Sequence, residues 1–313
     1  MKIVMLEGLG VSQDIINFHI LRLKSMGHEL VCYQKDADPD VQLSRSEGAD
    51  AIILANMPLS ERVVESVPTL RFIDVAFTGV DHIPMGLARS KGIAVSNASG
   101  YATQAVAETT IGFMIQLLRH VDEVQGRCRS GGTKDGLVGN LLSGKVIGII
   151  GAGAIGKRVA MLCKAFGCKV IAFSRSPFSD PNIDSQVTLE ELLRASDIVS
   201  LHCPLTDETR GMIGAEQIGM MKDSALLVNT ARGAVIDSSA LASALRDGRL
   251  AGAACDVFEM EPPISADHPL LDCPHTILTP HIAFASKESM ELRAEIVFDN
   301  LYSWIDGRQK NVM

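Results

Sequence analysis

Residues 146–156 read VIGIIGAGAIG, and this stretch decides the fold. Its first five residues form a short apolar run, three glycines (Gly151, Gly153 and Gly156) follow at once, and a helical segment closed by Gly167 comes next. A strand, G-x-G-x-x-G and a helix in this order are typical of a βαβ unit that binds a dinucleotide. The first glycine permits the tight turn, the second lets the pyrophosphate approach the backbone, and the third lets the helix pack on its strand. A structural glycine turn without ligand is the alternative.

The residues after the next strand bear on the choice of dinucleotide. An acidic residue at this strand end binds a free ribose 2′-hydroxyl. Here the strand at 169–173 ends in Ser174, Arg175 and Ser176. A guanidinium flanked by hydroxyl groups suits a 2′-phosphate, which a carboxylate would repel. The sequence therefore predicts NADP(H) rather than NAD(H), against the alternative that Arg175 is an ordinary exposed loop residue.

Short apolar runs separated by helical segments recur on both sides of this stretch. We expect strands at 2–6, 29–33, 51–55, 72–76 and 93–96, and again at 146–150, 169–173, 197–202, 225–229 and 251–257. We expect helices at 12–26, 60–66, 189–195, 238–246 and 286–305. This alternation predicts an α/β protein with two doubly wound parallel sheets.

A long periodic segment begins near Thr103 and joins the two sets of strands. We expect its apolar residues to share one helical face: Val106, Phe113, Leu117, Val121 and Val124. A glycine-rich connection follows at 131–144.

Composition limits the partners. The chain has 313 residues, about twice the length of a typical domain, which favours two domains. It carries 29 Lys and Arg against 37 Asp and Glu, a formal net charge of -8. Nucleic acid and anionic membranes are therefore not expected as partners.

Cysteine usage and hydropathy bear on the compartment. The seven cysteines are scattered and never spaced as a CxxC pair, which is typical of a reducing compartment. No stretch approaches the ~18 apolar residues of a membrane span. No carboxylate or cysteine lies at metal-ligand spacing near His82, His202, His268 or His275, so no metal site is expected. A cytoplasmic protein without signal peptide or anchor is predicted.

Several further motifs carry a resemblance that covers essentially the whole chain. It reads HCPLTDETRGMI from His202, MKDSALLVNTARGAVID from Met221, AGAACDVFEMEP from Ala251 and TPHIA from Thr279, with VDHI from Val80 and AVAE from Ala105. With the glycine loop, these stretches resemble the D-isomer-specific 2-hydroxyacid dehydrogenase family. The resemblance implies a Rossmann cofactor domain (101–283) inserted into a flavodoxin-like substrate domain (1–100 and 284–313), and a homodimer. Two departures stand out: Ser174 replaces the usual acid, and the segment 131–142 lacks the usual aromatic residue, which bears on the dimer contacts.

Three residues match the family positions for catalysis. The resemblance implies that Arg232 binds the carboxylate and carbonyl of a 2-keto acid, that His281 donates the proton, and that Glu261 supports the charged imidazolium. The residue types suit these roles, because a guanidinium binds oxygen pairs as a fork and histidine exchanges protons near neutral pH. Each residue taken alone also has a structural explanation: Arg232 as a surface cation, His281 as a packed loop histidine and Glu261 as a turn residue.

The resemblance also implies binding residues. Asp256 matches the residue that accepts from the nicotinamide carboxamide, and the backbone of Thr78, Gly79 and Val80 matches the loop that holds the substrate carboxylate. Substrate contacts are expected for Asn56, Met57 and Tyr101, with simple packing as the alternative for Met57. The remaining cofactor contacts are expected at Ala154, Ile155, Cys203, Pro204 and Thr230.

Other functions of the same fold are less well matched. A dinucleotide-sensing co-repressor is the alternative of a different class, but the chain lacks the long tails that such a role suggests. Formate dehydrogenases carry Gln where this chain has Glu261. A phosphoglycerate dehydrogenase is disfavoured because residues 78–85 contain no Lys or Arg to hold a phosphate. The expected substrate is an unphosphorylated acid: glyoxylate, hydroxypyruvate, pyruvate or a larger 2-keto acid.

Overall fold

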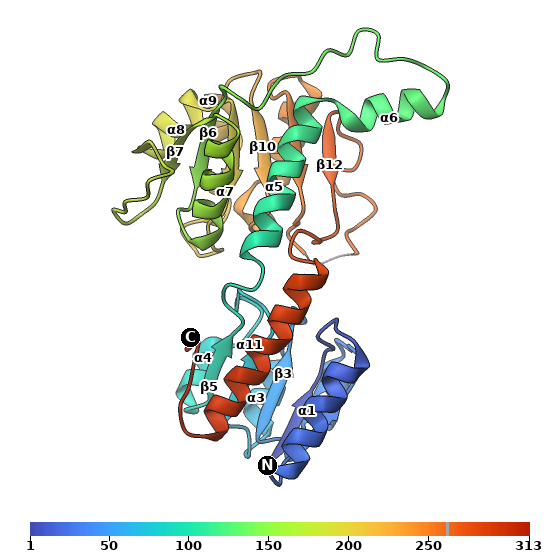
Figure 1. Cartoon of the computed structure of the whole chain (residues 1–313), viewed down its shortest axis with the longest axis vertical. Coiled ribbons are helices and arrows are strands. Elements are labelled where there is room, and N and C mark those ends of the chain that lie inside the picture. Colours follow the sequence, from blue (N-terminus) through green and yellow to red (C-terminus); the bar gives the residue numbers. More distant parts are fainter. Residues whose placement is uncertain (261–262) are drawn as a thin grey trace. The chain divides into compact units, whose positions relative to one another are not determined.

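The computed structural model describes residues 1–260 and 263–313. These residues form two compact units: Met1–Ala102 with Ala285–Met313, and Thr103–Phe284. Each unit contains one sheet whose strands all pair in parallel. The predicted α/β class with two doubly wound parallel sheets is therefore confirmed (Figure 1).

The first unit is built on a five-stranded sheet in the order β2-β1-β3-β4-β5. This is the flavodoxin-like order, with its topological switch between β1 and β3. Its elements are β1 (Lys2–Met5), α1 (Gln13–Ser25), β2 (Glu29–Cys32), α2 (Pro39–Ser46), β3 (Ala51–Leu54), α3 (Glu61–Ser66), β4 (Phe72–Val75), α4 (Met85–Ser90), β5 (Ala94–Asn97) and α11 (Lys287–Ile305).

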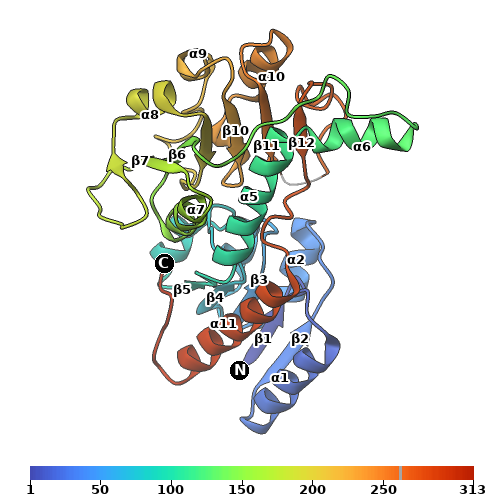
Figure 2. The ribbon, with the colours of Figure 1, turned by 45° about the horizontal axis from the view of Figure 1, so that its top comes forward.

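The last helix packs on the first unit through a buried polar contact and an aromatic one. Asn300 donates from Nδ2 to Asp74 Oδ1 over 3.1 Å and to the carbonyl of Asn97 over 3.0 Å. The ring of Trp304 stacks on Phe72 with 4.8 Å between centroids. Figures 1 and 2 both show α11 lying across this sheet. The C-terminal helix thus belongs to the same core as the first hundred residues.

The second unit is built on a seven-stranded sheet in the order β12-β11-β10-β9-β6-β7-β8. Counted from β6, its first six strands follow the doubly wound dinucleotide-binding order, with the switch between β6 and β9. Its elements are α5 (Thr103–Leu118), α6 (Val121–Arg129), β6 (Val146–Ile150), α7 (Ala154–Ala165), β7 (Lys169–Phe173), β8 (Ser185–Gln186), α8 (Leu189–Ala195), β9 (Ile198–Leu201), α9 (Ala215–Met220), β10 (Leu226–Asn229), the 3-10 turn Gly233–Val235, α10 (Ser238–Arg246), β11 (Gly252–Cys255) and β12 (Thr276–Leu278).

Local sequence explains where several helices of this unit begin. Thr188 and Glu191 form a reciprocal capping box at the start of α8, and Asp237 accepts from two backbone N–H groups at the start of α10. Apolar residues of α5 and α7 then pack on one face of the sheet in a single buried cluster that includes Met114 and Val159.

The single helical face predicted from Thr103 onward is wrong beyond Leu117. The helix stops at Leu118, and His120 adopts a left-handed backbone conformation (φ 52°) before α6 begins at Val121. The side chain of Val121 is 40% exposed, and Val124 is only partly buried. A left-handed residue redirects the chain, so the apolar spacing continues in sequence but not on one face.

Two strands of the second sheet were not predicted. β12 and β8 lie at the two edges of the sheet and are short. Both residues of β8 are exposed, and β12 is only partly buried. Their sequences therefore lack the apolar runs that mark the central strands. None of the helices in the described parts of the chain is long and apolar enough to cross a bilayer.

Candidate active site

The glycine loop joins β6 to α7, and each glycine occupies a different environment. Gly151 has a φ of 102°, and a Cβ there would lie 2.7 Å from the backbone N of Cys203. A Cβ on Gly156 would lie 2.1 Å from the carbonyl oxygen of Gly151, whereas one on Gly153 would meet nothing within 4 Å. As expected from the sequence, Gly151 makes the turn, Gly153 leaves an open position and Gly156 lets the helix pack closely.

The helix that follows the loop presents its amino end at this sheet edge. Gly153 is the residue before the helix, and its carbonyl accepts the first helical hydrogen bond, from Lys157 N over 2.9 Å. The N–H groups of Ala154, Ile155 and Gly156 precede that bond and have no acceptor within the helix. The amino end of a helix of this length favours an anion such as a pyrophosphate.

The segment after β7 carries the predicted ribose-binding residues. Gln186 donates from Nε2 to the carbonyls of Ser174 and Ser176, over 3.0 and 3.2 Å, which holds the turn closed. Arg175 is exposed, and its Nη1 lies 3.7 Å from Oε2 of Glu208. Glu208 was not singled out from the sequence, because only the fold brings residues 175 and 208 together.

The residues after β9 line the switch point. Cys203 is partly buried, and burial raises the pKa of its thiol. His202 lies against Ser200, with 2.8 Å between Nε2 and Oγ, and burial lowers the pKa of His202 to about 3. Pro204 lies on the exposed side of this segment, and its carbonyl accepts from Thr209 Oγ1 over 2.7 Å. The strand end thus presents a neutral imidazole and a neutral thiol beside the glycine loop.

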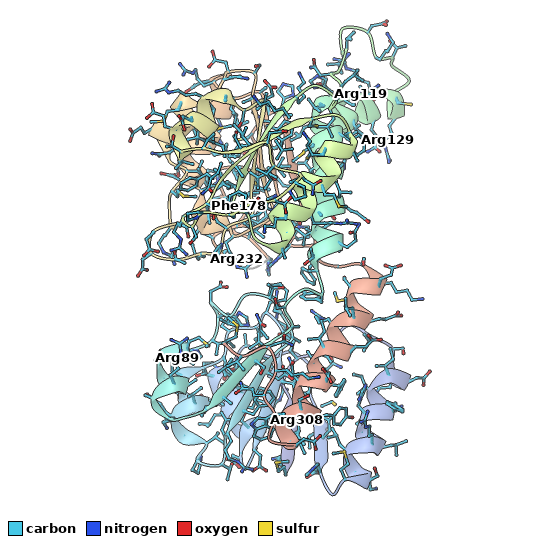
Figure 3. All side chains as sticks on the ribbon, turned by 60° about the vertical axis from the view of Figure 1, so that its left-hand side comes forward. Arg89, Arg119, Arg129, Phe178, Arg232 and Arg308 are labelled. Carbon is cyan, nitrogen blue, oxygen red and sulfur yellow. The ribbon has the colours of Figure 1, made fainter. Side chains whose placement is uncertain are left out.

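Hydrogen bonds to neighbouring residues hold Arg232 at the end of β10. Asn229 accepts from the N–H of Ala231 and donates to the carbonyl of Arg232, both over 3.0 Å. The guanidinium donates from Nη1 to the carbonyl of Ala231 over 2.8 Å. Figure 3 shows Arg232 at the rim of its unit. One position further, a Cβ on Gly233 would lie 1.8 Å from the carbonyl carbon of Phe258, so only glycine fits there.

Thr230 lies between the strand and Arg232. Its side chain is buried, and its Oγ1 lies 3.1 Å from Oγ1 of Thr110 in α5. This contact links the predicted cofactor-binding residue to the helix that covers the sheet.

Asp256 and His281 are connected through both main chain and side chain. The N–H of His281 donates to the carbonyl of Asp256 over 2.7 Å. The Asp256 carboxylate accepts from Thr279 Oγ1 (2.6 Å) and from the N–H groups of Ile282 and Ala283 (2.8 Å each). Burial raises the pKa of Asp256, and these hydrogen bonds oppose that shift. The carboxylate predicted to contact the nicotinamide therefore also fixes the loop that carries His281.

His281 itself has a left-handed backbone conformation, with φ at 57°. Its ring meets Phe284 edge to face, with 5.3 Å between centroids. The strands β10, β11 and β12 are neighbours, and they are followed in the sequence by Arg232, Asp256 and His281 respectively. All three residues therefore lie at the carboxyl end of one sheet. The predicted third catalytic residue, Glu261, lies outside the described residues.

The predicted substrate residues of the first unit lie in loops at the carboxyl edge of its sheet. Asn97 donates from Nδ2 to the carbonyl of Thr78 over 2.7 Å, and Val80 accepts from the N–H of Ile83 over 3.0 Å. Both contacts hold the backbone around Gly79. Tyr101 is buried beside Phe77, with 6.1 Å between ring centroids.

The loop after β3 contains the other two predicted substrate residues. Met57 is completely buried, whereas Asn56 is partly exposed. Glu7 accepts from the N–H groups of Ala55 and Met57, a role that its sequence context did not reveal. Its only sequence signal is that a charged residue interrupts an apolar run at the end of a strand.

Comparison with known proteins decides the family. The model of the D-isomer specific 2-hydroxyacid dehydrogenase, NAD binding domain matches residues 111–283. A glycerate dehydrogenase from Methylorubrum extorquens is 38% identical over 296 residues, which cover 91% of this chain and 92% of the relative. The chain belongs to the D-isomer-specific 2-hydroxyacid dehydrogenase family. The resemblance seen in the sequence is thereby confirmed.

A further relative and two solved structures are similar over nearly the whole chain. A glyoxylate reductase from Aeropyrum pernix is 38% identical over 307 residues, 92% of this dehydrogenase and 90% of the relative. Among solved structures, an acyclic imino acid reductase, Bsp5, in complex with NADPH and D-Arg has a TM-score of 0.92 at 28% identity, with both chains covered completely. D-lactate dehydrogenase from Aquifex aeolicus complexed with NAD and lactic acid has a TM-score of 0.86 at 31% identity, covering 98% of this chain and 96% of the other. An NAD(P)-binding oxidoreductase is thus established, and its relatives include complexes with both dinucleotides.

Proposed function

We propose that this dehydrogenase reduces small, unphosphorylated 2-keto acids, glyoxylate or hydroxypyruvate in particular, with NADPH preferred over NADH. The observation that carries this proposal is the placement of Arg232, Asp256 and His281 after three neighbouring strands of the dinucleotide-binding sheet. A glycerate dehydrogenase and a glyoxylate reductase among the relatives support the substrate class.

The second unit fits a dinucleotide. The position of Gly153 leaves room within 4 Å, and the amino end of α7 offers N–H groups from Ala154 onward. Ala154, Ile155, Cys203, Pro204 and Thr230 would line the cofactor. When bound, the dinucleotide supplies the hydride that the reaction transfers. The preference for NADPH rests on Arg175 between two serines, where an acid would serve a free 2′-hydroxyl.

The chain's own residues then bind the keto acid and deliver the proton. Arg232 holds the carboxylate and polarises the carbonyl, because its fork of N–H donors matches two oxygens. Backbone N–H groups of Thr78, Gly79 and Val80 hold the carboxylate. His281 donates a proton to the carbonyl oxygen as it becomes a hydroxyl.

Two further assignments complete this proposal. Glu261 supports the protonated form of His281 through its negative charge. Among the described residues, Oδ2 of Asp256 accepts from the N–H of Ala283, and a carboxylate oxygen can accept a second hydrogen bond, here from the nicotinamide carboxamide. Asn56 and Tyr101 would contact the substituent of the keto acid, whereas the complete burial of Met57 favours packing for its side chain.

We also propose a homodimer located in the cytoplasm. The segment before β6 exposes two large apolar side chains, Val138 at 81% and Leu141 at 70%, as a surface that a second copy would cover. All seven cysteines belong to the described residues and are free thiols, which supports a reducing compartment. Light scattering of the purified protein tests the dimer, and a monomeric mass would contradict it.

A panel of 2-keto acids assayed with NADPH and with NADH tests the activity. We expect turnover of glyoxylate and hydroxypyruvate, faster with NADPH at equal concentration. Turnover with NADH as good as with NADPH would contradict the cofactor preference. A complete lack of turnover with either dinucleotide would contradict the proposed activity.

A further inference from the structure

Three charged and polar side chains meet at the carboxyl edge of the first sheet. Glu7 follows β1, Lys35 follows β2 and Asn56 follows β3. The order β2-β1-β3 makes these three strands neighbours, and the topological switch lies between β1 and β3. In open α/β sheets, ligands bind outside the carboxyl ends of the strands at such a switch.

The contacts within this cluster are specific. Oε2 of Glu7 accepts from the N–H groups of Ala55 and Met57, each over 2.9 Å. Oε1 of the same carboxylate lies 3.1 Å from Nζ of Lys35, and the side chains are 9% and 50% exposed. Nζ of Lys35 also donates to Oδ1 of Asn56 over 3.3 Å. One nearly buried carboxylate thus organises both the loop and the cation beside it.

The loop is held on both sides of Asn56. Glu7 binds the N–H before and after it, and His82 Nε2 lies 2.7 Å from the carbonyl oxygen of Ala55. The carbonyl of His82 in turn accepts from Leu59 N over 3.1 Å. The loop at 55–59 is therefore tied to the loop at 78–83, which carries the expected carboxylate-binding backbone.

The contact with Lys35 fixes which way the Asn56 amide faces. A lysine ammonium only donates, so the atom that faces it must be the amide oxygen. The opposite side of the amide is then its nitrogen, which donates and does not accept. Loss of the cation removes the contact that favours the oxygen on this side of the amide.

We propose that Glu7 and Lys35 are positioning residues that hold Asn56 as a hydrogen-bond donor toward the substituent on the keto carbon. This inference rests on the proposed function. It assigns the enzyme a preference for substituents that bear an acceptor oxygen, such as the hydroxymethyl group of hydroxypyruvate. Pyruvate differs only by lacking that oxygen, so the amide nitrogen gains nothing from it.

The test compares kcat/KM for hydroxypyruvate with kcat/KM for pyruvate in the same protein sample. The wild type is expected to favour hydroxypyruvate at least ~5-fold, the value of one neutral hydrogen bond. Lys35→Met and Asn56→Ala should each reduce this ratio to near one, mainly through KM for hydroxypyruvate. Lys35→Arg, which keeps a donor and a positive charge, should retain most of the ratio.

The double variant Lys35→Met/Asn56→Ala separates a positioning role from an independent one. If Lys35 acts through Asn56, the double variant should show the same ratio as Asn56→Ala alone. A ratio that falls further, by the product of the two single effects, would overturn the positioning role. An unchanged ratio in Lys35→Met would overturn the whole inference.

Lys91→Met is the matched control. Lys91 is an exposed lysine of the same unit that donates to a backbone carbonyl, that of Glu65. It lies just before β5, at the opposite edge of the sheet, so its loss should leave the ratio unchanged. The ratio of the two kcat/KM values does not depend on the fraction of folded enzyme, because both substrates are assayed with the same protein sample. Turnover of no 2-keto acid would mean that the proposed function fails, whereas turnover with an unaltered ratio in Lys35→Met would mean that only this inference fails.

Discussion

The backbone N–H of His281 donates to the backbone carbonyl of Asp256 over 2.7 Å, and the carboxylate of Asp256 accepts from the next two N–H groups, those of Ile282 and Ala283. The end of β11 therefore holds the turn in which His281 has a left-handed conformation. Such a conformation persists where the surroundings hold it in place. Asp256 thus fixes the position of His281, in addition to its proposed contact with the nicotinamide.

Asp256→Asn should disturb this turn. An amide offers one acceptor oxygen, and its NH₂ group would face an N–H donor that the carboxylate now binds. We expect kcat to fall at least ~10-fold, while the dissociation constant of NADPH changes less than ~3-fold. Thr279→Val removes only the hydroxyl contact and should cost less. A large loss of NADPH affinity at unchanged kcat would show that the nicotinamide contact is the main role of Asp256.

Arg175→Ala tests the cofactor preference. The guanidinium is expected to bind the 2′-phosphate, and a charge-assisted hydrogen bond contributes about 1.5–3 kcal/mol. The KM for NADPH should therefore rise ~10-fold or more, whereas the KM for NADH should hardly move. Equal increases for both dinucleotides would contradict this assignment.

Glu208→Gln tests the same site by removing the negative charge beside Arg175. Glu208 lies 3.7 Å from Arg175 and accepts from Thr206 Oγ1 over 2.6 Å. That hydrogen bond is the main cause that lowers the pKa of Glu208, so the carboxylate remains charged and competes with a 2′-phosphate. The variant should bind 2′,5′-ADP more tightly, by a few-fold because both side chains are exposed. Titration calorimetry with 2′,5′-ADP and 5′-AMP measures this, and weaker binding of 2′,5′-ADP would contradict it.

Much of the second unit could be predicted because its signals are local. The apolar strand before Gly151 and the spacing to Gly156 specify a turn that depends on a few consecutive residues. The end of the helical face at Leu117 could not be predicted, because the left-handed conformation of His120 leaves the apolar spacing unchanged.

Contacts across long sequence separations were also missed, for a related reason. Glu7 binds backbone groups that are 48 and 50 residues away, and β8, α8 and β9 lie between Arg175 and Glu208 in the sequence. Only the strand order brings such residues together. The sequence could therefore indicate which strand ends carry function, but not which side chains meet there.

Asp74→Asn should stabilise the protein at neutral pH. Burial raises the pKa of Asp74 well above its ordinary value, and its Oδ2 is a buried atom without a hydrogen-bond partner. The folded state thus retains a proton that the unfolded chain releases, so the stability of the wild type falls as pH rises above the ordinary aspartate range. Asparagine carries no such proton. Above pH 7 the variant should therefore be more stable than the wild type.

Thermal unfolding between pH 4 and pH 8 measures this difference. The gap between Asp74→Asn and wild type should widen as pH rises, because only in the wild type does unfolding release a proton. Asp299→Asn is the control, since Asp299 is an exposed carboxylate on α11 that pairs with Lys310. A gap that stays constant with pH would show that the pKa of Asp74 is the same in the folded and unfolded states.

Glu261→Gln tests the expected support of the imidazolium through pH. Glutamine keeps the shape and a hydrogen bond but loses the charge, so the protonated imidazole loses its partner. Reduction needs the protonated form, so the alkaline limb of kcat/KM should move to lower pH in the variant. Oxidation of the hydroxy acid needs the neutral form, so its acidic limb should move the same way. Limbs that do not move in either direction would remove Glu261 from the mechanism.

The most direct measurement is kcat for 2-keto acid reduction by His281→Ala, together with its dissociation constant for NADPH. The glycine loop and the amino end of α7 do not involve His281, so dinucleotide affinity should stay within ~2-fold of wild type. Loss of the proton donor should lower kcat at least ~10²-fold. Turnover close to that of the wild type, with NADPH still bound, would contradict the account and assign proton donation to another group.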